Sequence, residues 1–127
     1  MRFPFDPKAR LLVVHATLFG PAGYADLRLA VDTGATFTII GRKPIGAAGY
    51  LASAEYSHQR VITVSGPERA PRVRVVSLRL LGKECRDFPV LCYNFPHDLG
   101  VDGLLGLDFL RRFRLIVDFP KGTISLR

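Results

Sequence analysis

The stretch that decides the fold is LAVDTGATFTII, residues 29 to 40, in which an apolar run ends at an aspartate. The residues before it, Tyr24 to Val31, alternate between apolar and polar side chains, as in a half-buried strand. Asp32 is then followed by a small turn, Thr33 to Ala35. A surface turn needs no apolar strand before it. The pattern therefore indicates that the strand delivers Asp32 to the mouth of the core.

The chain before this stretch is typical of a β-hairpin. Leu11 to Phe19 alternates in the same way, and Gly20 to Gly23 is a turn signal that leads into Tyr24 to Val31. Residues 1–9 contain two prolines, which oppose both a helix and an interior strand. We therefore expect an N-terminal arm over residues 1–9 and one domain over residues 10–127.

Beyond Asp32 the sequence predicts mostly β-structure with two short helices. The segment SGPERAP, residues 65–71, is expected to form a long exposed hairpin tip, and residues 94–103 a loop. One order of elements (hairpin, strand, apolar turn with glycine, helix) occurs twice, centred on Asp32 and on residues 104–106. The expected strands are residues 36–40, 60–64, 73–81, 84–93, 114–119 and 123–127, and the expected helices are residues 44–53 and 107–113.

Composition favours a single globular domain. The 127 residues are 48% hydrophobic and 23% charged. No apolar stretch reaches the roughly 20 residues that a bilayer requires, and the first residues do not resemble a secretory signal. We therefore expect a cytoplasmic protein with no membrane partner. Cys85 and Cys92 would lie about 20 Å apart on one extended strand, which predicts two free thiols.

The charge balance raises the alternative of a nucleic-acid-binding domain. The formal net charge is +7, from 18 Lys and Arg residues against 11 Asp and Glu residues. The basic residues are scattered, however, with local clusters at residues 69–74 and 111–114, no run of five or more, and no aromatic–basic interleaving of the kind that stacks bases. We expect no nucleic-acid partner, and a basic nucleic-acid-binding domain is the least favoured alternative.

Other chemistries find little support in the sequence. His15, His58 and His97 share no metal-ligand spacing, so we expect neither a metal nor another cofactor. No serine lies in a Gly-x-Ser-x-Gly motif, and Cys85 and Cys92 lack the flanking residues of a known nucleophile.

Two further aspartates are interpreted as structural. Asp102 lies among turn-forming residues and is expected to be an exposed turn residue. Asp108 is expected near the start of a helix, paired with Arg111 or Arg112. The triplet Asp-Thr-Gly is also ordinary turn chemistry, so a structural role for Asp32 stays open as the alternative to a catalytic one.

Three segments in this order resemble the retropepsin-like aspartic proteases. They are AVDTGA (residues 30–35), DGLLGLDFLRRF (residues 102–113) and IVDFPKGTISL (residues 116–126). The chain is most similar to the cellular and bacterial single-domain members, including the ubiquitin-shuttle protease relatives, over about residues 10–127. The resemblance implies a mostly β, closed barrel-like fold with a flap hairpin and one or two short helices.

The resemblance also implies which residues form the site. The catalytic residue would be Asp32 with its companions Thr33 and Gly34, and the structural apolar-apolar-Gly motif would be Leu104, Leu105 and Gly106. Such a site needs two carboxylates about 3 Å apart that share a proton. Because the chain carries one such motif, the second carboxylate would come from an identical chain across a two-fold axis. Residues expected to contact substrate are Ala35, Val64, Ser65, Gly66 and Leu104.

The function that follows is an aspartic endopeptidase, active as a homodimer on extended peptides, with a bell-shaped pH profile displaced toward acid. One position and one segment depart from the viral members. Thr36 stands where they carry an acidic residue, and the expected flap tip, residues 65–71, is poorer in glycine than theirs. The alternative with the same fold is a catalytically inactive module for dimerisation or peptide binding.

Overall fold

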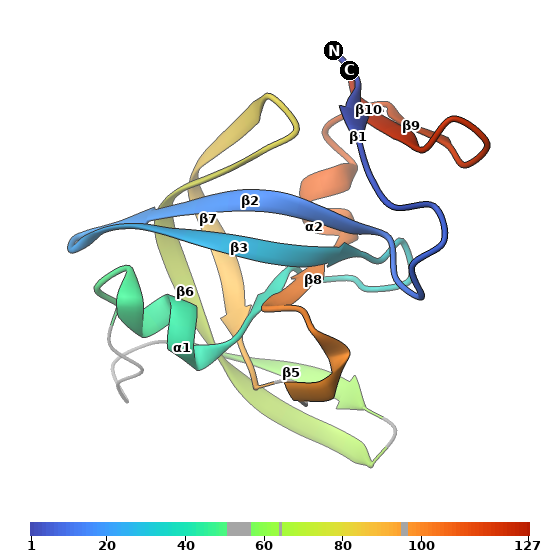
Figure 1. The fold of residues 1–127 in the computed structure, drawn as a ribbon. Coiled ribbons are helices and arrows are strands. Elements are labelled where there is room, and N and C mark those ends of the chain that lie inside the picture. Colours follow the sequence, from blue (N-terminus) through green and yellow to red (C-terminus); the bar gives the residue numbers. More distant parts are fainter. Residues whose placement is uncertain (51–56, 64, 95–96) are drawn as a thin grey trace.

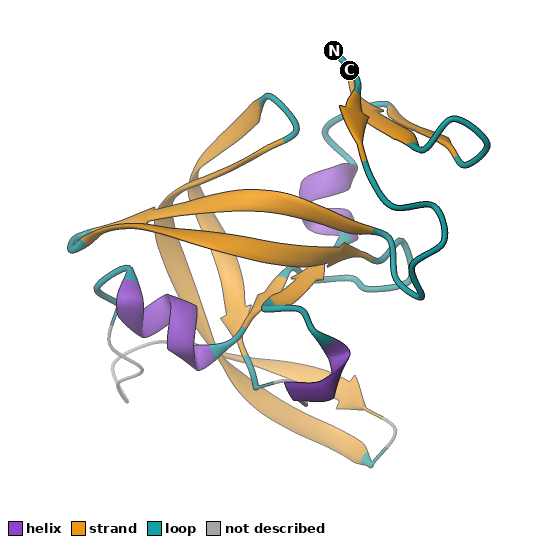
Figure 2. Cartoon of the chain, viewed as in Figure 1, coloured by secondary structure: helices purple, strands orange, loops and turns teal. Residues whose placement is uncertain are grey.

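The computed structural model describes residues 1–50, 57–63, 65–94 and 97–127. Strands dominate this part of the chain, and neither of its α-helices is long or apolar enough to cross a membrane (Figures 1 and 2). The strands are β1 (Phe3–Pro4), β2 (Val13–Gly20), β3 (Gly23–Val31), β4 (Ile39–Ile40), β5 (Ser57–Thr63), β6 (Gly66–Leu80), β7 (Lys83–Cys92), β8 (Gly103–Leu105), β9 (Leu115–Asp118) and β10 (Thr123–Leu126). The helices are α1 (Arg42–Ala47), α2 (Leu107–Leu110) and the 3-10 helix η1 (His97–Leu99).

Six strands close into a barrel. Their order is β2-β3-β8-β4-β7-β6, and β2 also pairs with β6, which joins the two ends of the sheet. β5 pairs with the first half of β6, so the β5–β6 hairpin extends away from the barrel (Figure 1). A smaller sheet, β1-β10-β9, brings the two chain ends together. The predicted mostly β, closed barrel-like fold is confirmed.

The core fills the barrel with the inward-facing residues of each strand. Leu18 of β2 and Leu29 of β3 are fully buried. Burial of each such leucine stabilises the folded state by roughly 1.5–3 kcal/mol. Phe88 of β7 packs edge-to-face against Phe109 of α2, with ring centroids 5.5 Å apart. This contact holds α2 against the barrel.

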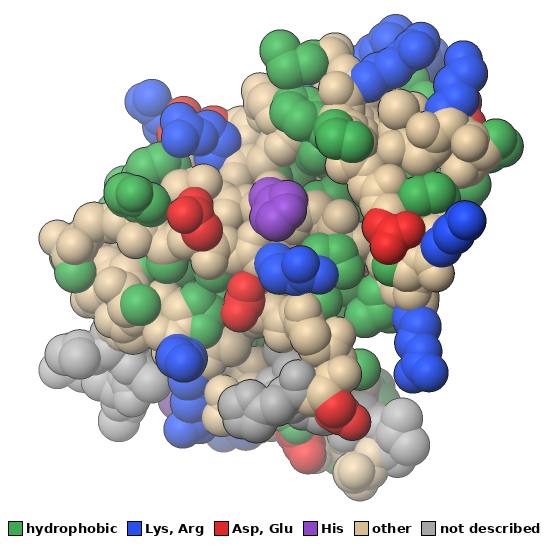
Figure 3. All heavy atoms as spheres, in the orientation of Figure 1, with side chains coloured by type: hydrophobic (Ala, Val, Ile, Leu, Met, Phe, Trp, Pro, Cys, Tyr) green, Lys and Arg blue, Asp and Glu red, His purple; other side chains and the backbone are tan. Residues whose placement is uncertain are grey.

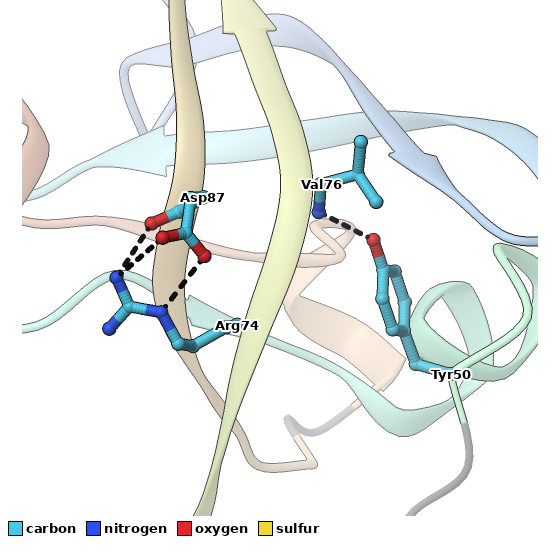
Figure 4. A network of polar contacts seen from close by, with 4 residues as sticks. All are labelled: Tyr50, Arg74, Val76 and Asp87. Carbon is cyan, nitrogen blue, oxygen red and sulfur yellow. Dashed lines mark hydrogen bonds and ion pairs between the residues drawn. The ribbon is translucent and has the colours of Figure 1, made fainter.

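A polar network fixes the middle of β6 (Figure 4). Asp87 has a φ of 50°. Asp87 and the opposite Val76 are left out of the pairing between β6 and β7. The Val76 N–H instead donates to the Tyr50 hydroxyl at 2.7 Å, and that hydroxyl donates to the Phe19 carbonyl at 2.6 Å. The Arg74 guanidinium donates to Asp87 at 2.9 Å and lowers the pKa of its carboxyl. Tyr50 thereby ties the end of the α1 segment to β2 and β6.

Several predicted boundaries were wrong. Residues 1–9 contain β1, whose Phe3 pairs with Ile124; a proline is tolerated there because β1 is a sheet edge. The strand predicted over residues 36–40 is reduced to β4, and both α-helices are shorter than expected, with residues 51–53 of the first lying outside the described part of the chain.

The predicted tip over residues 65–71 is also wrong, because β6 already begins at Gly66. Its first residues pair with β5, from Thr63 opposite Gly66 to Ser57 opposite Arg72. β7 pairs with β6 from Arg72 onward, so one side of the preceding residues is an open strand edge. Prolines at such an edge cost no ladder hydrogen bond. The hairpin tip therefore lies between Thr63 and Gly66.

The two thiols agree with their prediction. Cys85 and Cys92, at opposite ends of β7, are both free and buried. Burial raises the pKa of each thiol, which keeps both in the neutral form at neutral pH. They are core residues of the barrel.

Candidate active site

Asp32 lies directly after β3, at the end of the barrel where β8 runs beside it. β3 and β8 pair in parallel, with Val31 opposite Leu105, and the Asp32 N–H donates to the Leu105 carbonyl at 2.9 Å. On its other side β8 pairs antiparallel with β4, with Ile39 opposite Leu104. The chain therefore passes around the end of β8 between Asp32 and β4. Both limbs of this loop, residues 32–38 (the Asp32 loop), are anchored to the same short strand, β8.

The turn itself orients the Asp32 carboxylate. Its Oδ1 accepts a hydrogen bond from the Gly34 N–H at 2.9 Å, and the Asp32 carbonyl accepts one from the Ala35 N–H at 3.1 Å. Asp32 is half-buried, whereas Thr33 and Gly34 are exposed. The predicted catalytic residues thus form one compact turn, presented at the surface with its carboxylate held in place.

Thr38 connects this loop to the second copy of the repeated element order. It is fully buried, and its hydroxyl donates to Asp108 Oδ1 at 2.7 Å and accepts from the Gly106 N–H at 3.1 Å. The Thr38 N–H also donates to the Asp108 carboxylate. Two helix residues add backbone bonds: the Leu107 N–H donates to the Ala35 carbonyl at 2.8 Å, and the Asp108 N–H donates to the Thr36 carbonyl at 3.3 Å. The Asp32 loop is therefore fastened to the start of α2.

The predicted pairing of Asp108 with an arginine was wrong. No ion pair joins Asp108 to Arg111 or Arg112 in the part of the chain that the structure describes. Its carboxylate instead accepts from Thr38 and from the Phe109 N–H at 2.9 Å. A residue in the first turn of a helix can reach free backbone N–H groups there, and these bonds satisfy the carboxylate better than an exposed pair.

Replacing Asp108 with Ala is expected to lower the free energy of unfolding by about 2–3 kcal/mol, because a buried hydroxyl and a backbone N–H of Thr38 would lose their acceptor. Urea denaturation followed by circular dichroism measures the change. Asp26→Ala, at an exposed position of β3, is the control and should change stability by less than about 0.5 kcal/mol. Equal effects of the two substitutions would contradict this role for Asp108.

Close packing requires glycine on both sides of Leu104 and Leu105, at Gly103 and Gly106. A Cβ on Gly106 would lie 2.5 Å from the backbone of Phe37, and one on Gly103 would lie 2.0 Å from the Ile39 carbonyl oxygen. Leu105 between them is fully buried. The outgoing limb of the Asp32 loop therefore rests directly on β8 and on the residue before α2.

Asp102 also differs from its prediction. It is half-buried, and its Oδ2 accepts from the Arg28 N–H at 2.8 Å. Its own N–H donates to the Arg28 carbonyl, and its carbonyl accepts from the Gly41 N–H, both at 2.8 Å. Asp102 thus bridges β3 to the segment that enters α1, and its role is structural.

A groove of about 370 Å³ lies beside the Asp32 turn, between the loop and the β5–β6 hairpin. Ala35, one of the residues expected to contact substrate, lines it. Ser65 and Gly66 lie at the hairpin tip, Leu104 is half-buried in β8, and Val64 is outside the described residues. The lining residues are Gly34, Ala35, Thr36, Phe37, Ile39, Arg60, Val61 and Ile62.

Thr36 and five further lining residues were not predicted as site residues. Phe37 and Ile39 belong to a stretch interpreted as a strand and not as the wall of a groove, and β5 supplies Arg60, Val61 and Ile62. Ile62 is 86% exposed, which is unusual for an isoleucine in a strand. The apolar residues next to the predicted hairpin tip were the signal that could have found Val61 and Ile62.

Elsewhere in the described residues, neither the charge distribution nor the placement of possible metal ligands indicates a second site. On the face shown in Figure 3, Lys and Arg side chains lie in several separate groups with acidic side chains between them. Within the described ranges, no three His, Cys, Asp or Glu side chains come close enough together to hold a metal ion. The Asp32 loop and its groove are therefore the strongest candidate site.

Comparisons with known proteins agree with this geometry. A family model described as "Aspartyl protease" matches residues 14–109, which include the Asp32 turn and the start of α2. Among solved structures the chain is similar to a retropepsin-like aspartic protease from Rickettsia conorii, with 22% sequence identity and a TM-score of 0.71. That match covers 99% of this chain and 89% of the other. None of the curated protein sequences compared with the chain matches it.

Proposed function

The chain belongs to the aspartyl protease family, whose model spans well over half of its residues, and from this premise we propose that it hydrolyses peptide bonds as a homodimer with Asp32 of both chains in one catalytic pair. The observation that carries the proposal is the Asp32 turn: one carboxylate, fixed by the Gly34 N–H and anchored to β8, beside a groove.

The carboxylates around the turn support the proposal of a second chain. Asp102 and Asp108 are the acidic residues of the adjoining segments, and each is engaged by backbone N–H groups of Arg28 or Thr38. In the described part of the chain, no second carboxylate is bonded to that of Asp32. A symmetric dimer would place Asp32 against its own copy, and the exposed Thr33 and Gly34 would then be covered.

The pair would act by general acid–base catalysis. Two carboxylates about 3 Å apart cannot both ionise easily, so they share one proton. The ionised Asp32 accepts a proton from water, which attacks the scissile carbonyl carbon, while the protonated Asp32 donates a hydrogen bond to the carbonyl oxygen. A proton then passes to the amide nitrogen of the tetrahedral intermediate, and the C–N bond breaks. Thr33 would orient the pair, and Gly34 would let the two turns approach without a Cβ between them.

Mixing chains tests the shared site. When wild-type protein is mixed with an equal amount of Asp32→Asn protein and allowed to exchange subunits, activity should fall to about one-quarter of that of wild type at the same total concentration, because only dimers with two intact chains cleave. A site within one chain would retain about half. Peptide hydrolysis is measured after mixing and also on serial dilution, which should lower the activity per chain.

Asp26→Asn protein serves as the control partner in the mixture, since Asp26 is an exposed residue of β3 away from the turn. It should leave the activity unchanged. Retention of half the activity with Asp32→Asn, together with dilution-independent rates, would contradict the dimeric mechanism. Peptide binding by wild-type protein without any cleavage between about pH 3 and 8 would instead favour the inactive peptide-binding module.

A further inference from the structure

We propose that Arg60 makes the groove beside Asp32 selective for peptides that carry an acidic side chain. The inference rests on the proposed function, because it takes this groove as the substrate site. Arg60 lies in the middle of β5 and lines the groove together with its neighbours Val61 and Ile62. It faces the Asp32 loop across a space of about 370 Å³.

The chemistry of the groove singles out this residue. Arg60 is the one charged residue among the described residues that line it; the others are apolar, glycine or threonine. The ion pairs in the described part of the chain are Arg74 with Asp87 and Arg86 with Glu84, so they leave Arg60 uncompensated. A guanidinium binds a carboxylate through two parallel hydrogen bonds, which makes Glu and Asp its preferred peptide partners.

The register of the hairpin adds a second observation. Arg60 of β5 lies directly opposite Arg69 of β6, and His58, two residues away, lies on the same face. Like charges at directly opposed positions destabilise a sheet. An acidic side chain bound between them would relieve that repulsion. A second hollow of about 470 Å³ is lined by His58, Arg60, Pro67, Glu68 and Arg69, so Arg60 borders both the groove and this hollow.

Glu68 lines this hollow too, but it forms no ion pair with Arg60 or Arg69 in the described part of the chain. The register places it opposite Val61, on the other face of the hairpin from Arg60. Its carboxylate accepts a hydrogen bond from the Tyr93 hydroxyl at the end of β7. That bond fastens the hairpin to the barrel. Arg60 therefore keeps a guanidinium without an ion-pair partner among the described residues, while the apolar residues of the groove favour a peptide over a bare phosphate chain.

Binding of matched peptides to Asp32→Asn protein tests the inference without turnover. The probes are short fluorescent apolar peptides that differ in one side chain, Glu, Gln or Lys, placed in turn at every position, and affinity is measured by anisotropy. At the best position the Glu peptide should bind about three- to tenfold more tightly than the Gln peptide, and the advantage should shrink in high salt. Introducing Arg60→Gln should remove the advantage, and Arg60→Lys should retain part of it.

Arg79→Gln is the matched control, because Arg79 is an exposed arginine at the far end of β6. It should leave the preference intact. Equal binding of Glu and Gln peptides at every position, or a preference that survives Arg60→Gln, would overturn the inference. Tighter binding of a generic DNA duplex than of any peptide, lost in Arg60→Gln, would overturn it in favour of nucleic acid.

The same peptides given to wild-type protein test the proposed function separately. If none is cleaved while the Arg60-dependent preference for Glu persists, peptide hydrolysis fails and the charge selectivity stands. If peptides are cleaved with equal kcat/KM for Glu and Gln at all positions, hydrolysis stands and the role of Arg60 fails. Melting temperatures of all variants should agree within a few degrees, since Arg60 is exposed.

Discussion

Replacing Asp32 with Asn is expected to lower kcat for peptide hydrolysis by about 10³-fold or more, because the amide can neither accept the proton of water nor share one with its partner. The fold should persist. The Asn side-chain oxygen can still accept the Gly34 N–H bond that Asp32 Oδ1 accepts at 2.9 Å. Initial rates on an extended peptide, with circular dichroism of the same samples, measure both effects.

The control is Asp26→Asn, which changes the same chemical group six positions earlier on an exposed part of β3. Its kcat should stay within about twofold of wild type, as expected for a surface position. An Asp32→Asn protein that retained more than about a tenth of the wild-type rate would mean that the chemistry depends on another group.

The second large effect is expected from Gly106→Ala, which should reduce the free energy of unfolding by about 3 kcal/mol or more. The backbone of Gly106 is in an extended conformation that alanine adopts freely, so strain in φ is not the cause. The cause is contact. The added Cβ would lie 2.5 Å from the carbonyl group of Phe37 and 2.9 Å from the Thr38 nitrogen, both backbone atoms. Urea denaturation measures the loss.

Gly46→Ala provides the opposite case in the same protein. Gly46 lies in α1, and a Cβ there would meet no atom within 4 Å. Alanine favours a helix over glycine by up to about 1 kcal/mol, so this substitution should stabilise the protein. If both substitutions changed stability alike, the close approach of β8 to the Asp32 loop would not be the reason for Gly106.

Local patterns were enough to predict the parts of the fold that neighbours in sequence determine. The β2–β3 hairpin follows from alternating residues around the Gly20 to Gly23 turn, and its observed register closes with Gly20 opposite Gly23. The position of Asp32 after an apolar strand predicted the turn that the structure places beside the groove. The family resemblance supplied the closed barrel, which neither periodicity nor composition specifies.

Contacts between distant segments could not be read in the same way. Asp108 has an arginine three residues away in sequence, yet it binds Thr38, which is 70 residues away. Residues 66–71 looked like a turn because of Pro67 and Pro71, whereas the open edge beside them admits both. Arg60 gave no signal, because its position on the groove depends on how β5 folds over the Asp32 loop.

The pairing of β3 with β8 also governs when the site can form as the chain is made. The Asp32 N–H bonds to Leu105, and the Arg28 N–H bonds to a side chain 74 residues further along. A chain emerging from the ribosome therefore adds about 70 residues after Asp32 before the turn has the strand that fixes it. Pairings across such separations form late and slowly. Nascent chains therefore carry the aspartate without its setting until β8 has been made.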